Sequence, residues 1–166
     1  MGDLSKIQAG PCSIKYDVVE IGHTEEGIEF NYEPDIRERL VDEFGTTAVE
    51  LVLTGENVTI TVRIAEWVLA NFKIAIPAGL DGTSYLGIGR KPGFLLGSKA
   101  KQIVLHPLEK AAGDTTEDAT FWKAVPNSPV AIGWNNDGDR IFEVVFKCLP
   151  DPAKPDGKLI GKIGAA

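Results

Sequence analysis

The chain has 166 residues, of which 43% are hydrophobic and 25% charged, and its net charge is −7. This length predicts one domain, residues 1–166, that buries roughly 70% of its unfolded surface. No run of about 18 apolar residues occurs, which excludes a membrane-spanning helix. The first residues lack the apolar core of a signal peptide, so we expect the protein to stay in the cytosol.

Strands dominate the predicted secondary structure. Apolar alternation, broken about every 8 to 12 residues by Gly, Pro, Asn or Asp, is typical of a β-sandwich or barrel. In chain order the predicted strands are 12–19, 27–33, 47–53, 57–64, 84–89, 101–108, 119–125, 128–134, 140–149 and 158–164. The segment NNDGD, 135–139, is the strongest hairpin turn. We therefore expect a mainly β fold of two sheets.

One segment has helical rather than strand periodicity. Within residues 64–75, Ile64, Trp67, Val68 and Phe72 recur at helical spacing. The pattern predicts a single α-helix lying across a sheet.

The segment 34–45 combines dense charge with isolated apolar residues. We expect Pro34 to end the preceding strand, and six of the next nine residues are charged. Ile36, Leu40 and Phe44 are apolar and follow i, i+4, i+8 spacing, so a helix or an edge hairpin packed on the protein's own core is one interpretation. The other is a projecting arm whose apolar residues are covered by a neighbouring subunit.

The uneven distribution of charge favours the arm. Residues 1–66 contain 14 acidic and 5 basic residues, whereas residues 67–166 contain 10 acidic and 12 basic ones. The basic residues of the second part include Arg90, Lys91, Lys99, Lys101 and Lys110. In a head-to-tail assembly these regions are complementary. We do not expect a DNA-binding site, since the net charge is negative and no aromatic residues alternate with the basic ones.

Catalytic and metal-binding motifs are not found. Cys12 and Cys148 form no CxxC pair, His23 and His106 are expected at the surface or as capping residues, and GxSxG is missing. We expect no enzyme activity, no cofactor and no metal.

Several segments, taken in order, resemble the tail tube (major tail) proteins of tailed bacteriophages. They are GPCSIKY, EIGHTEEG and LTGENVTITV in the N-terminal half, and TFWKAVP and GKLIGKIG in the C-terminal half. The similarity covers nearly the whole chain, with 76–100 the least similar part. Trp122 and the basic loop 87–99 depart from the pattern.

The resemblance implies a structural virion protein of siphophage type with a β-sandwich and a flanking helix. Six copies would join their sheets into an inner β-barrel, and the rings would stack into a hollow tube that conducts DNA without binding it specifically. The implied partners are further copies of the chain, a tape measure protein, a tail terminator and tail tip proteins. The implied location is the virion tail, assembled in the bacterial cytoplasm.

The resemblance and the residue pattern together suggest three groups of site residues. The inter-subunit arm comprises Ile36, Arg37, Glu38, Arg39, Leu40, Asp42, Glu43 and Phe44; the ring-stacking partners are Arg90, Lys91, Lys99 and Lys101; the lumen-lining candidates are Glu29, Glu33, Thr59 and Thr61. Two alternatives stay open: another β-sandwich virion protein, such as a tail terminator or decoration protein, and a carbohydrate-binding module. The latter needs an exposed aromatic row, but Trp67, Trp122 and Trp134 are expected in a helix and two core-like strands.

Overall fold

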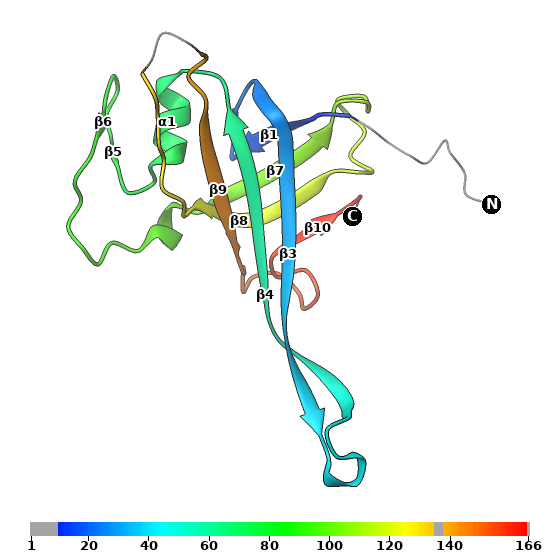
Figure 1. The fold of residues 1–166 in the computed structure, drawn as a ribbon. Helices are drawn as coiled ribbons and strands as arrows, with labels where there is room; N and C mark the ends of the chain where they lie inside the picture. Colours follow the sequence, from blue (N-terminus) through cyan, green and yellow to red (C-terminus); the bar gives the residue numbers. More distant parts are fainter. Residues whose placement is uncertain (1–9, 135–137, 166) are drawn as a thin grey trace.

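A computed structural model describes residues 10–134 and 138–165, and its main feature is one large antiparallel sheet (Figure 1). The elements are β1 (Cys12–Tyr16), β2 (Val19–Glu20), β3 (Thr24–Leu40), the 3-10 turn η2 (Asp42–Phe44), β4 (Ala48–Ile64), α1 (Leu69–Ala75), β5 (Leu80–Asp81), β6 (Leu86–Gly87), η3 (Leu96–Lys99), β7 (Lys101–Pro107), β8 (Ala119–Pro126), β9 (Phe142–Leu149) and β10 (Gly161–Ile163). The strand order is β2-β1-β7-β8-β9-β4-β3, with β10 paired to β8, while β5 and β6 pair separately. The prediction of a mainly β fold with one α-helix is confirmed for the described residues.

The large sheet bends around a core. In Figure 1, β1, β7 and β8 cross behind β3, β4 and β9. Two ring contacts join these groups: Phe30 stacks on Phe121 with centroids 5.4 Å apart, and Tyr16 packs on Phe146 at 5.3 Å. Alternate residues of β4 and β9 fill the space between, namely Val58, Ile60, Val62, Ile64, Phe142, Val144, Phe146 and Cys148. The alternation predicted from the sequence is therefore what places these side chains inside.

The helix α1 is shorter than predicted. Residues 64–75 were expected to be helical, but Ile64 ends β4 and α1 begins at Leu69. The reason is a competing set of hydrogen bonds with the β2–β3 turn: the Ala65 amide donates to the His23 carbonyl, and the His23 amide donates to the Glu66 carboxylate. The helix packs on the core through Phe72, whose ring lies 5.1 Å from that of Phe142.

The turn before β3 requires glycine at position 22, and this requirement can be tested by substitution. This residue has φ 83°, and a Cβ there would collide with the Glu66 carboxylate. Gly27→Ala is a matched control, because Gly27 has φ 81° but open space around it. We expect Gly27→Ala to lower the free energy of unfolding by about 1–2 kcal/mol. We expect Gly22→Ala to lower it by about a further 0.5–1.5 kcal/mol, because the Glu66 side chain must move and lose the hydrogen bond that it accepts from the His23 amide. Urea unfolding measures both; equal losses would contradict a role for the Glu66 contact.

Two predicted strand ends are wrong. Pro34 does not end its strand, because β3 continues to Leu40 with Pro34 opposite Glu56. Proline is tolerated in an edge strand such as β3, because an N–H on the open side of the strand makes no ladder bond. The predicted strands 47–53 and 57–64 are one strand, β4, since the TGE segment between them forms only a bulge.

Other segments contain less strand than predicted. Residues 84–89 contribute only Leu86–Gly87, residues 158–164 only Gly161–Ile163, and residues 128–134 form no strand. The turn predicted at 135–139 therefore has no strand before it, and residues 135–137 lie outside the described residues.

Candidate assembly surface

Beyond the body of the protein, β3 and β4 continue alone as a two-stranded hairpin that we call the arm, residues 34–56 (Figure 1). The strands stay paired to the end, with Ile36 opposite Leu53 and Leu40 opposite Ala48, and η2 forms the tip. At about 3.3 Å per residue, the stretch from Pro34 to Leu40 extends roughly 20 Å. The helical interpretation of 34–45 is wrong: Ile36 and Leu40 share a face through strand alternation.

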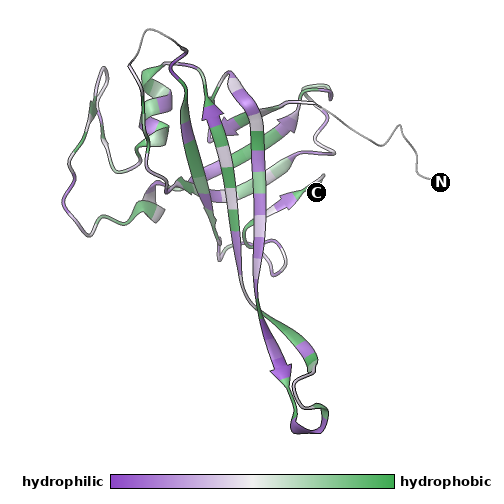
Figure 2. Cartoon of the chain, in the orientation of Figure 1, coloured by the Kyte–Doolittle hydropathy of each residue, from purple (hydrophilic) through white to green (hydrophobic). Residues whose placement is uncertain are grey.

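One face of the arm is mainly apolar. Residues opposite each other in an antiparallel pair share a face, so alternation places four exposed apolar side chains together, with Glu38 among them opposite Leu51. They are Ile36, Leu40, Leu51 and Leu53, between 53% and 60% exposed. Arg37, Val52, Arg39 and Glu50 occupy the opposite face. Figure 2 shows that the arm is mostly hydrophilic along β3 and mostly hydrophobic along β4. The sequence did not assign Leu51 and Leu53 to this surface, because the return strand was assigned to the body.

A bulge keeps the apolar face of the arm continuous with the core side of the sheet. The register shifts between Asp35 and Ile36, which leaves Thr54 as the extra residue, and its hydroxyl donates to the Asp35 carbonyl at 3.0 Å. Leu53 therefore borders the same groove as Phe30 and Tyr32, about 460 Å³ in volume. The arm thus extends one layer of the core beyond the point where a second layer covers it.

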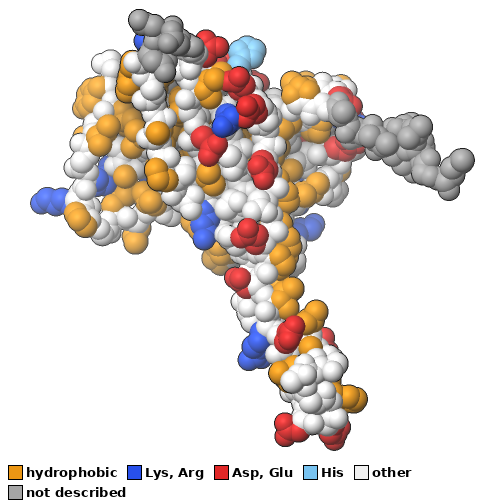
Figure 3. All heavy atoms as spheres, in the orientation of Figure 1, with side chains coloured by type: hydrophobic (Ala, Val, Ile, Leu, Met, Phe, Trp, Pro, Cys, Tyr) orange, Lys and Arg blue, Asp and Glu red, His pale blue; other side chains and the backbone are white. Residues whose placement is uncertain are grey.

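The four lumen-lining candidates do lie on one face. Glu29 is opposite Thr61, and Glu33 follows on the same side, opposite Asn57. Their neighbours Phe30 and Ile60 point to the core, so the four polar residues point away from it. Figure 3 shows mostly acidic side chains over this part of β3 and β4.

Basic residues also belong to this outer face. Arg63 pairs with Glu26 and, at 3.4 Å, with Glu143, and Lys147 is opposite Thr59. The sequence did not identify them because β9 had not been placed beside β4. The face is polar and mixed in charge, not purely acidic.

The basic residues expected to form one stacking surface are divided. Arg90 donates to the Ala78 carbonyl at 2.9 Å and lies over the Phe94 ring. Lys99 pairs with Asp81 at 3.3 Å and Lys101 with Asp17 at 3.1 Å. Lys91 is exposed in the loop after β6. Of these four residues, Lys99 and Lys101 border a common pocket.

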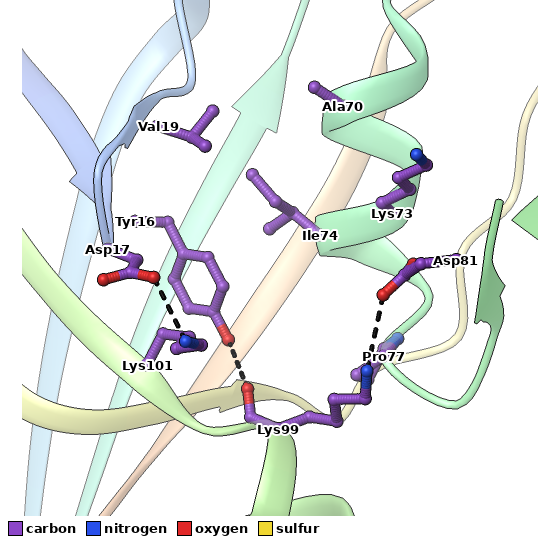
Figure 4. Close-up of a pocket in the computed structure, with 10 residues that line it drawn as sticks. All are labelled: Tyr16, Asp17, Val19, Ala70, Lys73, Ile74, Pro77, Asp81, Lys99 and Lys101. Atoms are coloured by element: carbon purple, nitrogen blue, oxygen red, sulfur yellow. Dashed lines mark hydrogen bonds and ion pairs between the residues drawn. The ribbon is translucent and has the colours of Figure 1, made fainter. Parts of the chain in front are cut away.

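That pocket lies between α1 and the ends of β1 and β7, and we call it the α1 pocket (Figure 4). Its volume is about 260 Å³, and its lining is Tyr16, Asp17, Val19, Ala70, Lys73, Ile74, Pro77, Asp81, Lys99 and Lys101. The Tyr16 hydroxyl donates to the Lys99 carbonyl at 3.1 Å, and burial raises the pKa of Tyr16 to about 12. The pocket therefore has an apolar floor and a charged rim.

His106 is not the surface residue that the sequence suggested. Its side chain is largely buried, and Nδ1 lies 2.6 Å from Oδ1 of Asp118. Ser13 is its strand neighbour, but the Ser13 hydroxyl donates to the His106 carbonyl rather than to the imidazole. The pair fastens the loop before β8 to β7. His23 is exposed, as expected.

The two cysteines are free thiols with different accessibility. Burial raises the pKa of Cys148 to about 12 and also raises the pKa of Cys12, whose side chain is only half-buried. At pH 8 a thiol of pKa about 12 is ~10⁻⁴ thiolate, the form that reacts. In native protein we expect Ellman's reagent to modify Cys12 well before Cys148, and both to react at once in urea. Equal native rates would contradict the burial of Cys148.

Trp134 is 69% exposed and does not lie in a core-like strand, so that prediction is wrong. Its ring meets Trp67 edge to face at 5.5 Å, and Arg140 lies over Trp67. Because the two rings are nearly perpendicular, at 81°, they do not form the flat aromatic row of a carbohydrate platform.

Within the described ranges 10–134 and 138–165, no cluster of three His, Cys, Asp or Glu side chains could hold a metal ion. No helix in the same ranges is long and apolar enough to cross a membrane. Compared with known proteins, the chain matches no family model and no curated protein.

Proposed function

We propose that this protein is a self-assembling structural protein of a phage tail, whose copies form rings that stack into a hollow tube. The observation that carries the proposal is the arm, which has four exposed apolar side chains on one face that the described part of the chain does not cover. Full burial of a fully exposed side chain of this kind contributes about 1.5–3 kcal/mol, and a little more than half of each remains to be covered, at 53–60% exposure. Assembly with a second copy that covers this face would gain that free energy. The resemblance to tail tube proteins, in which copies of one chain pack against each other, supports the same arrangement.

The edge of the sheet supports lateral assembly. β3 is an edge strand of 17 residues, much longer than most edges that proteins leave open. Its outer backbone groups are available to pair with a neighbouring copy, which would join the sheets of a ring into one barrel. The bent sheet of each copy would then serve as the sandwich of the tail-tube type.

In such a ring the outer face of β3, β4 and β9 lines the bore. Glu29, Glu33, Thr59 and Thr61 lie on this face, together with Arg63, which is engaged by carboxylates, and Lys147 opposite Thr59. A polar surface with few free cations lets DNA slide, because tight binding requires many lysine or arginine contacts to phosphate. The tape measure protein, the terminator and the tip proteins are the further partners of this proposal.

Negative-stain electron microscopy of the purified chain tests the proposal. We expect rings with six-fold symmetry or hollow tubes, in proportions that depend on protein concentration. A protein that remains monomeric at all concentrations, or that forms one small closed oligomer, would argue for a decoration or terminator role instead.

A further inference from the structure

The tip of the arm presents one aromatic ring beside two carboxylates. The turn η2 contains Asp42, Glu43 and Phe44, and it ends at Gly45, whose φ is 62°. Phe44 is 61% exposed. Figure 3 shows acidic side chains at the end of the arm. The tip is therefore an apolar knob with two negative charges at its base.

The α1 pocket has the complementary chemistry. Its volume of about 260 Å³ exceeds the roughly 150 Å³ of a protein cavity that takes up benzene. Val19, Ala70, Ile74 and Pro77 give it apolar walls (Figure 4). Its rim has three lysines, Lys73, Lys99 and Lys101, against two aspartates, Asp17 and Asp81.

The ion pairs on the rim leave room for further carboxylates. In the Lys99–Asp81 and Lys101–Asp17 pairs, each side chain is between 40% and 51% exposed. Such exposed pairs are weak, so a lysine can share or exchange its partner at little cost. The excess of one positive charge on the rim favours an acidic occupant.

We infer that the α1 pocket of one copy receives Phe44 from the arm of another copy, with Asp42 and Glu43 meeting Lys99 and Lys101. A copy does not fill its own pocket, because its arm projects from the body away from α1 (Figure 1). The contact joins two different surfaces and therefore propagates from copy to copy. This inference rests on the proposed function and names the acceptor of the arm.

A variant of the pocket tests the inference without touching the arm. Ala70 is exposed on α1, so Ala70→Trp should fill the pocket and leave the fold intact. We expect it, like Phe44→Asp, to raise the protein concentration for half-maximal assembly at least about tenfold, the equivalent of ~1.4 kcal/mol. Ala153→Trp, at an exposed alanine outside the pocket, is the matched control and should leave assembly unchanged. Normal assembly of Ala70→Trp would overturn the inference.

Photocrosslinking locates the tip directly. The chain carrying Phe44→p-azidophenylalanine is mixed with isotopically labelled wild-type chain, irradiated and mapped by mass spectrometry. We expect crosslinks between copies to Tyr16, Ile74 or Pro77, and none of these from the same label at Ile88, an exposed residue away from the arm.

The outcomes separate the inference from the proposed function. Tubes without crosslinks into the pocket would overturn the inference and leave the proposed function standing. Crosslinks into the pocket without rings or tubes would support the inference and overturn the tube. If the protein shows no crosslinks into the pocket and no assembly, both the inference and the proposed function are overturned.

Discussion

The double variant Ile36→Asp with Leu40→Asp is expected to remain folded and to lose assembly completely. Both side chains are more than half exposed, at 54% and 53%, so the isolated subunit loses little when they become charged. In the assembly, two carboxylates would be buried against apolar groups of the neighbour, and an unpaired buried charge costs several kcal/mol. Thermal unfolding followed by circular dichroism measures whether the variant is folded, and negative-stain electron microscopy measures whether it assembles.

The matched control keeps the same positions apolar. Ile36→Leu with Leu40→Ile preserves volume and hydrophobicity, so this variant should assemble like the wild type. A double aspartate variant that unfolds as a monomer would show that these side chains belong to the core of their own chain. One that still forms tubes would show that no neighbour covers the arm there.

The largest loss of stability is expected from Phe146→Ala. Phe146 is fully buried in β9, and its ring packs on Tyr16 across the bend of the sheet. Truncation removes the apolar contact and leaves a cavity, and such changes cost about 3–5 kcal/mol. Denaturant unfolding of the subunit measures this difference.

A control variant at the same position separates the contribution of side-chain volume to stability from that of the ring contact with Tyr16. Phe146→Leu retains most of the volume and should cost less than the alanine variant. A loss below about 1 kcal/mol for Phe146→Ala would contradict a core closed between β1 and β9.

Local pattern predicted the strands of the body well, because period-2 burial is a property of neighbouring residues. β4 and β9 follow the alternation of their sequence residue by residue, from Val58 to Ile64 and from Phe142 to Cys148. The true length of β3 and β4 was missed, since Pro34 and the TGE segment usually end strands. Only the edge position of β3 and the bulge at Thr54 allow both strands to continue, and neither is visible from local sequence.

The candidate surface was predicted in part. Ile36, Leu40 and Phe44 were identified as exposed apolar residues of an arm, and their exposure agrees with this. Leu51 and Leu53 depend on pairing with β3, so their place on the same face follows from the register and not from composition. The partners of Lys99 and Lys101 within the subunit, Asp81 and Asp17, depend on the tertiary fold in the same way.

An electron cryomicroscopy reconstruction of the assembled protein tests the central claim most directly. We expect a hollow tube in which Ile36, Leu40, Leu51 and Leu53 are covered by an adjacent copy and Glu29 and Glu33 face the bore. Arms that extend free into solvent, or a bore lined by lysines, would contradict it.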